Sequence, residues 1–233
     1  DEQNLRVWVP DCRRGQDAYS LAIMFNEAMP QLASWDVEIW ATDPRQQELK
    51  QARSGKFTSA EISSGIPKHL IKKAFYPYAN HYRVQARHRR ILEFYRLGLH
   101  DDWNKLCKFD LIMLRKPIAY MPDHFINELL ERMATQLLPG GVLVIGEGAE
   151  QISHPQFELD PHLGDAGLRL RAKPSETTFR HAPPPAPHVF DEAAVLETNE
   201  MIEHLTKARH THLDEETSAR VLKTKVQLFL GDG

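Results

Sequence analysis

The stretch that most constrains the fold is residues 6–23, RVWVPDCRRGQDAYSLAI. A short apolar run at residues 6–9 stops at Pro10, and a polar turn around Gly15 leads into a helical pattern at residues 17–28. A strand, a tight turn and a helix N-terminus in this order are typical of the first unit of an open α/β sheet, where a nucleotide-like ligand lies against the turn. If the chain binds a cofactor, we expect the cofactor at this corner.

Strand and helix patterns then alternate, which predicts a largely parallel sheet with helices on its faces. The next expected strands are residues 36–41, 109–114 and 142–145, and the expected helices are residues 44–53, with Pro44 as first helical residue, and residues 122–138. The last two strands, residues 168–172 and 177–180, are expected to form an antiparallel hairpin. A parallel sheet that ends in a late hairpin is the topology of class I methyltransferases, a Rossmann-like fold class.

The region at about residues 56–96 interrupts this alternation and is expected to be a small inserted β-subdomain. We expect it to contain a short helix and a two-stranded hairpin, at residues 67–74, 81–84 and 91–94. Eight lysines and arginines face a single acid, Glu93, between residues 66 and 96. Such a patch could steer an acidic protein partner, although clustered surface charges are also common on faces that only contact water.

Residues 182–188, APPPAPH, form the clearest expected boundary, a stiff proline-rich linker. Residues 1–181 are therefore expected to be the main domain, and residues 189–233 a helical extension. Two amphipathic helices alone need a partner surface, so residues 189–230 are expected to mediate self-association or to contact a neighbouring domain.

Composition argues against several classes of protein. The balance of 29 Lys+Arg against 32 Asp+Glu argues against a general nucleic-acid binder. The chain has only two cysteines, Cys12 and Cys107, which suggest neither a disulfide framework nor a zinc site, so a cytoplasmic protein is expected. His210 and His212 lack acidic or cysteine partners, so no metal is expected. No long apolar run predicts a membrane span, and the start at Asp1 leads us to expect further chain upstream.

Four segments together resemble the CheR family, the chemoreceptor protein-glutamate methyltransferases. In this chain they read RVWVPDCRRGQDAYSLAI, ATDPRQQELKQARSGKF, FDLIMLRKPIAYM and LLPGGVLVIGEG. They occur in the family's order and spacing, with the insertion included, over roughly residues 5–180. The resemblance implies a class I methyltransferase fold that uses S-adenosylmethionine to esterify a receptor glutamate, leaving S-adenosylhomocysteine.

The resemblance also implies roles for individual residues. Asp43 matches the acid that binds the cofactor, and a carboxylate at the end of a second strand can accept both hydroxyls of a ribose. Arg115 and Tyr120 match residues at the methyl-transfer centre, where an arginine can orient a substrate carboxylate. The other implied cofactor contacts come from Cys12, Gly15, Gln16, Gly98, Leu99 and Lys116. Asp43 could instead only cap the following helix, and Arg115 could be a surface ion pair.

Several positions depart from the family pattern. Gln16 replaces an acid, which removes a charge that could pair with an ammonium group. Gly98 replaces an asparagine at the adenine end, and Lys116 replaces another asparagine, which adds a cation beside a sulfonium cofactor. The family's N-terminal helical subdomain is not found in this chain, and its GHSE tetrad reads GEGA at residues 146–149.

These departures leave two main hypotheses open. The first is a CheR-like protein-glutamate methyltransferase, with weakened activity, that acts on a chemoreceptor or related signalling protein through residues 66–96. The second is a catalytically inactive signalling or scaffold module that keeps the fold and the partner surface, and that binds protein partners or senses S-adenosylmethionine or S-adenosylhomocysteine without methyl transfer. A methyltransferase for a nucleic acid or a small molecule would need another explanation of the insertion.

Overall fold

The computed structural model describes residues 4–114, 121–146, 149–160, 163 and 166–171. Within these residues, no helix combines the length and apolar character needed to cross a membrane. The linker and the helical extension expected beyond residue 181, and the strand expected at residues 177–180, lie outside them.

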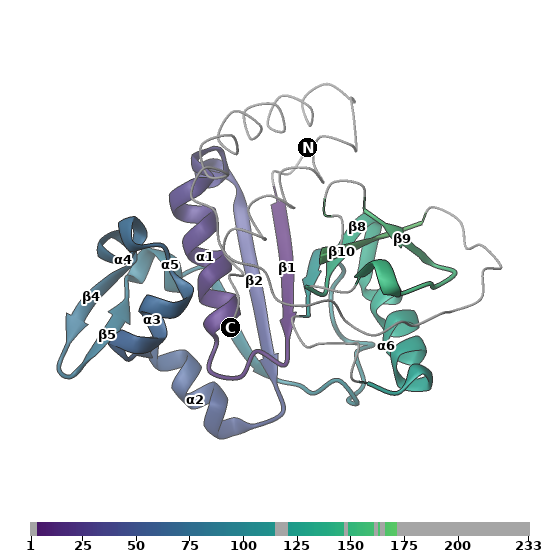
Figure 1. Ribbon diagram of the computed structural model, residues 1–233, viewed down its shortest axis with the longest axis horizontal. Coiled ribbons are helices and arrows are strands. Elements are labelled where there is room, and N and C mark those ends of the chain that lie inside the picture. The colour runs from purple at the N-terminus through teal and green to yellow at the C-terminus, as the bar shows by residue number, and fades with distance from the viewer. Residues whose placement is uncertain (1–3, 115–120, 147–148, 161–162, 164–165, 172–233) are drawn as a thin grey trace.

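A seven-stranded sheet in the order β6-β2-β1-β7-β8-β10-β9 forms the centre of the molecule (Figure 1). Its strands are β1 (Asn4–Pro10), β2 (Asp36–Asp43), β6 (Leu92–Arg96), β7 (Phe109–Met113), β8 (Leu137–Val144), β9 (Phe157–Leu159) and β10 (Gly167–Leu170). All the pairs from β6 to β8 are parallel, whereas β10 runs antiparallel to both of its neighbours. This order and the reversed β10 confirm the class I methyltransferase topology expected from the sequence.

Both faces of the sheet are buried because successive residues of its strands are apolar. Val7 and Val9 point to the face covered by α1 (Gln16–Ala28) and α2 (Gln46–Ser54), whereas Trp8 packs on the face covered by α6 (Asp123–Gln136). The Trp8 ring lies edge-on to Trp103 with a centroid distance of 4.8 Å. The sheet is therefore the middle layer of three, as its sequence pattern predicts.

The inserted subdomain lies beside α1, at the opposite end of the molecule from β8–β10 (Figure 1). Its three-stranded sheet has the order β3-β5-β4, from β3 (Lys56–Phe57), β4 (Phe75–Tyr78) and β5 (His81–Val84). Its helices are α3 (Ser59–Gly65), α4 (Lys68–Ala74) and α5 (Ala86–Arg89). Elsewhere the described residues form two short 3-10 turns, η1 (Pro30–Ser34) and η3 (Ala149–Gln151).

The expected hairpin of residues 81–84 with 91–94 was wrong. β5 instead forms a hairpin with β4 and also pairs with β3, while β6 pairs in parallel with β2 in the main sheet. The two strands do not pair because residues 85–90 contain the short helix α5 and carry the chain from one sheet to the other. Periodicity identified both strands but could not give their partners.

Two other expectations need correction. The second helix begins at Gln46, with Arg45 at its N-cap, so Pro44 precedes it instead of opening it. The late strand expected at residues 168–172 is β10, and in the described part of the chain its partners are β8 and β9; β9 carries no clear period and was not expected.

Candidate functional site

The loop after β1 is a tight turn at the carboxyl edge of the sheet. Asp11, Arg13 and Gly15 have φ angles of 51°, 49° and 85°, the left-handed region that favours glycine. The backbone N–H of Gly15 donates to the carbonyl oxygen of Cys12 at 2.8 Å, and the N–H of Cys12 donates to the carbonyl oxygen of Thr42 at 2.9 Å. The loop is therefore held against the end of β2, and two non-glycine residues carry backbone strain there.

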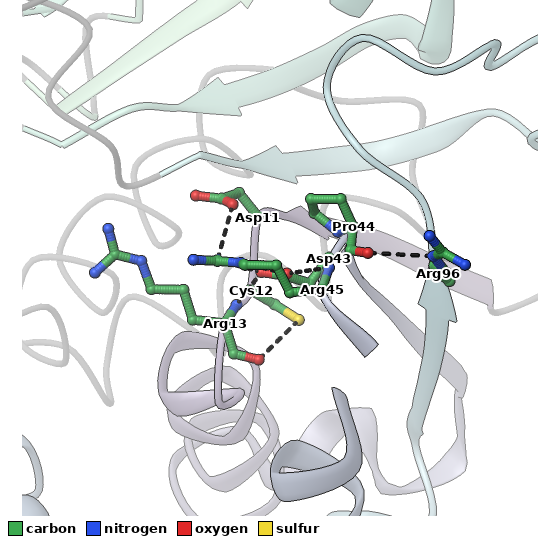
Figure 2. Close-up of polar contacts among 7 residues, drawn as sticks. All are labelled: Asp11, Cys12, Arg13, Asp43, Pro44, Arg45 and Arg96. Carbon is green, nitrogen blue, oxygen red and sulfur yellow. Dashed lines mark hydrogen bonds and ion pairs between the residues drawn. The ribbon is translucent and has the colours of Figure 1, made fainter. Parts of the chain in front are cut away.

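Asp43 lies at the end of β2, and its side chain is fully buried. Its Oδ2 accepts the backbone N–H of Arg13 at 2.8 Å, and its Oδ1 accepts the backbone N–H of Arg45 at 2.9 Å. The carboxylate thus joins the loop after β1 to the residue that caps α2 (Figure 2). The sequence placed this acid at the sheet edge correctly, but gave no sign of how much it is enclosed.

The side chain of Arg45 binds the same carboxylate through a two-pronged contact. Its Nε donates to Oδ1 of Asp43 at 2.9 Å and its Nη2 donates to Oδ2 at 2.8 Å; the same Nη2 lies 3.3 Å from Oδ1 of Asp11 (Figure 2). The side chain of Arg45 remains 48% exposed. Parallel N–H bonds to both oxygens of a carboxylate are the strongest geometry for this pair.

These contacts set the ionisation of the pair. Burial raises the pKa of Asp43, but the hydrogen bonds from the Arg45 side chain and from the backbone of Arg45 and Arg13 outweigh burial, so the pKa lies below its usual value. The hydrogen bond with Asp43 in turn raises the pKa of Arg45. At neutral pH Asp43 is therefore an anion paired with the guanidinium of Arg45.

Cys12, Gly15 and Gln16 lie close to this pair along the chain and have different surroundings. Burial, followed by the charges of Asp43 and Asp11, raises the pKa of the Cys12 thiol to about 12, so Cys12 is a packing residue and not a nucleophile. Gly15 is the N-cap of α1, and Gln16, the first residue of that helix, is exposed. The neutral side chain of Gln16 is thus exposed to solvent where the loop after β1 meets α1.

Gly98 and Leu99 follow β6 and complete the described part of the site. The backbone N–H of Gly98 donates to Oδ2 of Asp101 at 2.6 Å, and its carbonyl oxygen accepts the indole N–H of Trp103 at 3.1 Å. A Cβ placed on Gly98 would lie 3.3 Å from Cβ of Pro44, so this backbone packs beside the Asp43 turn. The carbonyl oxygen of Leu99 accepts a hydrogen bond from Nη1 of Arg132 at 2.5 Å.

The structure brings the turn at Cys12 and Gly15 together with Asp43 and Gly98 at the carboxyl ends of β1, β2 and β6. Arg115, Lys116 and Tyr120 lie outside the described residues. Sequence reasoning missed the part played by Arg45, although its position two residues after the acid was a usable signal. At the end of β6, the Nε of Arg96 donates to the carbonyl oxygen of Pro44 at 3.2 Å (Figure 2).

The described residues contain no cluster of three or more His, Cys, Asp or Glu side chains that could hold a metal ion. The polar groups at this edge are carboxylates, backbone amides and guanidinium groups, which bind organic ligands through hydrogen bonds and charge. A crevice outside the carboxyl ends of the strands is also where open α/β sheets bind their ligands.

Comparison with known proteins relates this arrangement to one family. The family model described as "CheR methyltransferase, SAM binding domain" matches residues 1–160. A chemotaxis protein methyltransferase of Listeria innocua is 32% identical over 151 residues, which cover 65% of this chain and 55% of the relative. A probable chemotaxis protein methyltransferase of Rhizobium etli is 27% identical over 172 residues, or 72% of this chain and 64% of the relative.

The chain therefore spans between half and two thirds of the length of these two relatives. Among solved structures, a complex of DhpI with SAH is similar over 78% of this chain and 62% of that one, with 14% identity and a TM-score of 0.37. A likeness at that level adds nothing to the topology already described, which stands on the strand order itself.

Proposed function

The chain belongs to the CheR methyltransferase family, whose SAM-binding domain it contains, and from this premise we propose that it transfers a methyl group from S-adenosylmethionine to glutamate side chains of chemoreceptor-type signalling proteins, with weakened activity. The observation that carries the proposal is the buried carboxylate of Asp43 at the end of β2, held against the loop after β1. An acid at this point of a Rossmann-like sheet is placed to bind a ribose.

The described residues fit the cofactor if the side chain of Arg45 moves away from Asp43. Asp43 supplies the acid at the correct strand end, and the loop at Cys12 and Gly15 brings backbone close to it. However, Asp43 already accepts four hydrogen bonds, two of them from the side chain of Arg45. That side chain is about half exposed and can move into water, so the acid can serve a ribose once Arg45 has left it.

Each residue of the site then has a proposed role. Asp43 would hold the ribose, Gln16 would bind the amino-acid end, and the backbone at Gly98 and Leu99 would lie at the adenine end. Lys116 would weaken binding by placing a cation near the sulfonium group. Bound S-adenosylmethionine would supply an electrophilic methyl group.

The remaining roles concern the substrate. We assign Arg115 to orient the substrate carboxylate and Tyr120 to line the transfer centre, and both assignments rest on the resemblance to the family. Methyl transfer requires chiefly that the attacking oxygen, the methyl carbon and the leaving sulfur are aligned, so orientation is the main contribution expected from the protein.

The inserted subdomain is the proposed contact surface for the protein substrate. Tyr76 and Tyr78 are 36% and 40% exposed on the edge strand β4. The Nζ atom of Lys56 and the guanidinium carbon of Arg83 lie 4.5 Å and 5.4 Å from the centre of the Tyr78 ring. Cations stacked on exposed aromatic rings suit an acidic partner helix. Residues 189–230 are proposed to mediate self-association or to contact a neighbouring domain.

The alternative, an inactive partner-binding module, is favoured by one specific observation: the acid expected to bind the cofactor is saturated by groups of the protein itself. Gln16 and Gly98 also favour the inactive module, because neither supplies the side chain that the family uses at its position. The inactive module has two forms, one that binds only protein partners and one that senses S-adenosylmethionine or S-adenosylhomocysteine without methyl transfer. The methyltransferase differs from the first of these in whether the chain binds its cofactor at all.

Calorimetric titration of the chain with S-adenosylhomocysteine distinguishes them. We expect binding in the micromolar range that is lost in Asp43→Ala. Asp43→Asn keeps an acceptor for one of the two backbone N–H groups and is the milder variant if Asp43→Ala fails to fold. The absence of binding up to millimolar concentration would contradict the methyltransferase proposal for this chain and leave the inactive module.

A further inference from the structure

The two oxygens of Asp43 offer about four acceptor positions, and the structure fills four. Two are taken by the backbone N–H groups of Arg13 and Arg45, which belong to the fold of the loop and of the α2 cap. The other two are taken by Nε and Nη2 of Arg45. Only the two side-chain contacts can be given up without unfolding a turn.

The guanidinium group presents two parallel N–H donors, one to each oxygen of the carboxylate. Two neighbouring ribose hydroxyls would present two O–H donors to the same pair of oxygens. The fork of Arg45 thus has the donor pattern of a diol, with the addition of a positive charge that strengthens both hydrogen bonds.

We propose that Arg45 is an internal competitor of the cofactor ribose, and that it is the residue that sets the affinity of this chain for S-adenosylmethionine and S-adenosylhomocysteine. The inference rests on the proposed function, because it assumes that Asp43 receives the ribose. A ligand binds Asp43 only in molecules whose guanidinium has left, so the apparent affinity is the affinity of the open site multiplied by the fraction of open molecules.

The surroundings of Arg45 make this displacement feasible. Its side chain is 48% exposed, so the guanidinium can reach water without disturbing the core. Oδ1 of Asp11 already accepts Nη2 at 3.3 Å, so the displaced group has a second carboxylate beside it (Figure 2). The backbone N–H of Arg45 stays bonded to Asp43 in either position, so the α2 cap is kept.

Arg96 provides a matched control. It also lies at the carboxyl edge of the sheet, and its side chain is exposed, but its Nε donates to the carbonyl oxygen of Pro44 and not to Asp43 (Figure 2). Arg96→Ala therefore removes the same charge from the same edge and leaves the acceptors of Asp43 filled.

The test is calorimetric titration with S-adenosylhomocysteine of the unchanged chain and of Arg45→Ala, Arg45→Lys and Arg96→Ala. Because a charge-assisted bidentate contact is removed, Arg45→Ala should bind on the order of tenfold more tightly or better. Arg45→Lys, which keeps the charge and loses the fork, should fall between Arg45→Ala and the unchanged chain, and Arg96→Ala should stay within about twofold.

A second measurement uses the unchanged chain, in which Asp43 keeps its partner Arg45. In the unchanged chain, the Nε–H proton of Arg45, assigned by its loss in Arg45→Lys, should be protected from exchange with water and should lose that protection when S-adenosylhomocysteine is added. This measurement answers the question even if Arg45→Ala leaves a buried carboxylate that prevents folding.

The outcomes separate the two proposals. Binding by all variants with no gain in Arg45→Ala, or an unchanged Arg45 Nε–H signal at saturation, would overturn the role of Arg45 and leave the proposed function in place. Binding by none of them would overturn the proposed function, and the role of Arg45 with it. A gain in Arg96→Ala equal to that in Arg45→Ala would show that general charge, and not competition for Asp43, controls the affinity.

Discussion

At the scale of single residues, the shape of the site depends on Gly15 for two separate reasons. Its φ of 85° lies in the left-handed region, and a Cβ there would meet Cβ of Ala52 at 3.2 Å and Cε1 of Phe94 at 3.3 Å. The glycine is thus required by the turn and also by the close approach of the turn to α2 and β6. The sequence suggested the first requirement, and only the structure showed the second.

Gly15→Ala and Gly146→Ala can separate these two effects. Gly146 has a φ of 80°, and among the described residues beyond its chain neighbours no atom lies within 4 Å of an added Cβ. Gly146→Ala should therefore lower the free energy of unfolding by about 1 to 2 kcal/mol through backbone strain. Gly15→Ala should lower it by roughly a further 1 kcal/mol or more through overpacking. Urea unfolding of both variants measures the difference, and equal losses would mean that the neighbours of Gly15 move aside freely.

At the scale of elements, the inserted subdomain is tied to the site by α3. Thr58 caps this helix in a capping box, in which its Oγ1 accepts the backbone N–H of Glu61 and Glu61 Oε2 accepts the backbone N–H of Thr58 at 2.7 Å. Oε1 of Glu61 lies 2.6 Å from Nη1 of Arg14, in the loop after β1. The side chain of Glu61 therefore caps the first turn of α3 and also contacts the loop after β1.

Thr58→Ala should loosen this connection. Loss of the cap should reduce the free energy of unfolding by about 1 kcal/mol, and hydrogen exchange should quicken first at the backbone amides of α3. Ser63→Ala is the control, because the exposed Ser63 hydroxyl donates to the carbonyl oxygen of Ser59 within the same helix and does not take part in its cap. Similar exchange in both variants would argue that tertiary packing and not the cap holds α3 in place.

At the scale of the whole molecule, histidines are buried in two distant parts of the chain. His88 is fully buried in α5 of the insertion, where its Nε2 lies 3.4 Å from Oε1 of Glu27. His154 is 5% exposed before β9 and accepts the backbone N–H of Gln156 at its Nδ1. Burial lowers the pKa of both, aided at His88 by the charge of Arg87. Both imidazoles are therefore neutral in the folded protein near pH 7.

The protein should consequently lose stability between pH 7 and pH 5. As pH falls through about 6.5, the usual pKa in an unfolded chain, the unfolded state binds protons that the folded state resists, so the free energy of unfolding decreases. Each histidine contributes at most about 1.4 kcal/mol per pH unit in this range.

Urea unfolding at several pH values tests this expectation. His88→Gln and His154→Asn, which keep an acceptor near the original nitrogen, should each flatten the dependence of unfolding free energy on pH. His69→Gln, at an exposed position of α4, is the control substitution. A curve that is not flattened by either core substitution would place the acid sensitivity elsewhere.

The sequence by itself determined the fold class, the strand–turn–helix corner and the acid at the end of the second strand. These features are local: a run of apolar residues, a glycine in a turn and an acid next to a strand are visible within a few positions. It also determined the family, because four short segments occur in a fixed order. Of the three strands in the insertion, the sequence predicted only β5, at residues 81–84; β3 and β4 were not expected.

Only the tertiary structure decided which strands pair and which groups saturate Asp43. Strands β5 and β6 are neighbours in sequence but lie in different sheets, because partners are chosen by contacts between distant segments. The carboxylate of Asp43 is saturated because the loop after β1 and the start of α2 meet at one point of the sheet edge, where Arg45 can fold back over it. Which groups contact a buried carboxylate depends on distances in space. These distances cannot be read from the spacing of residues along the chain.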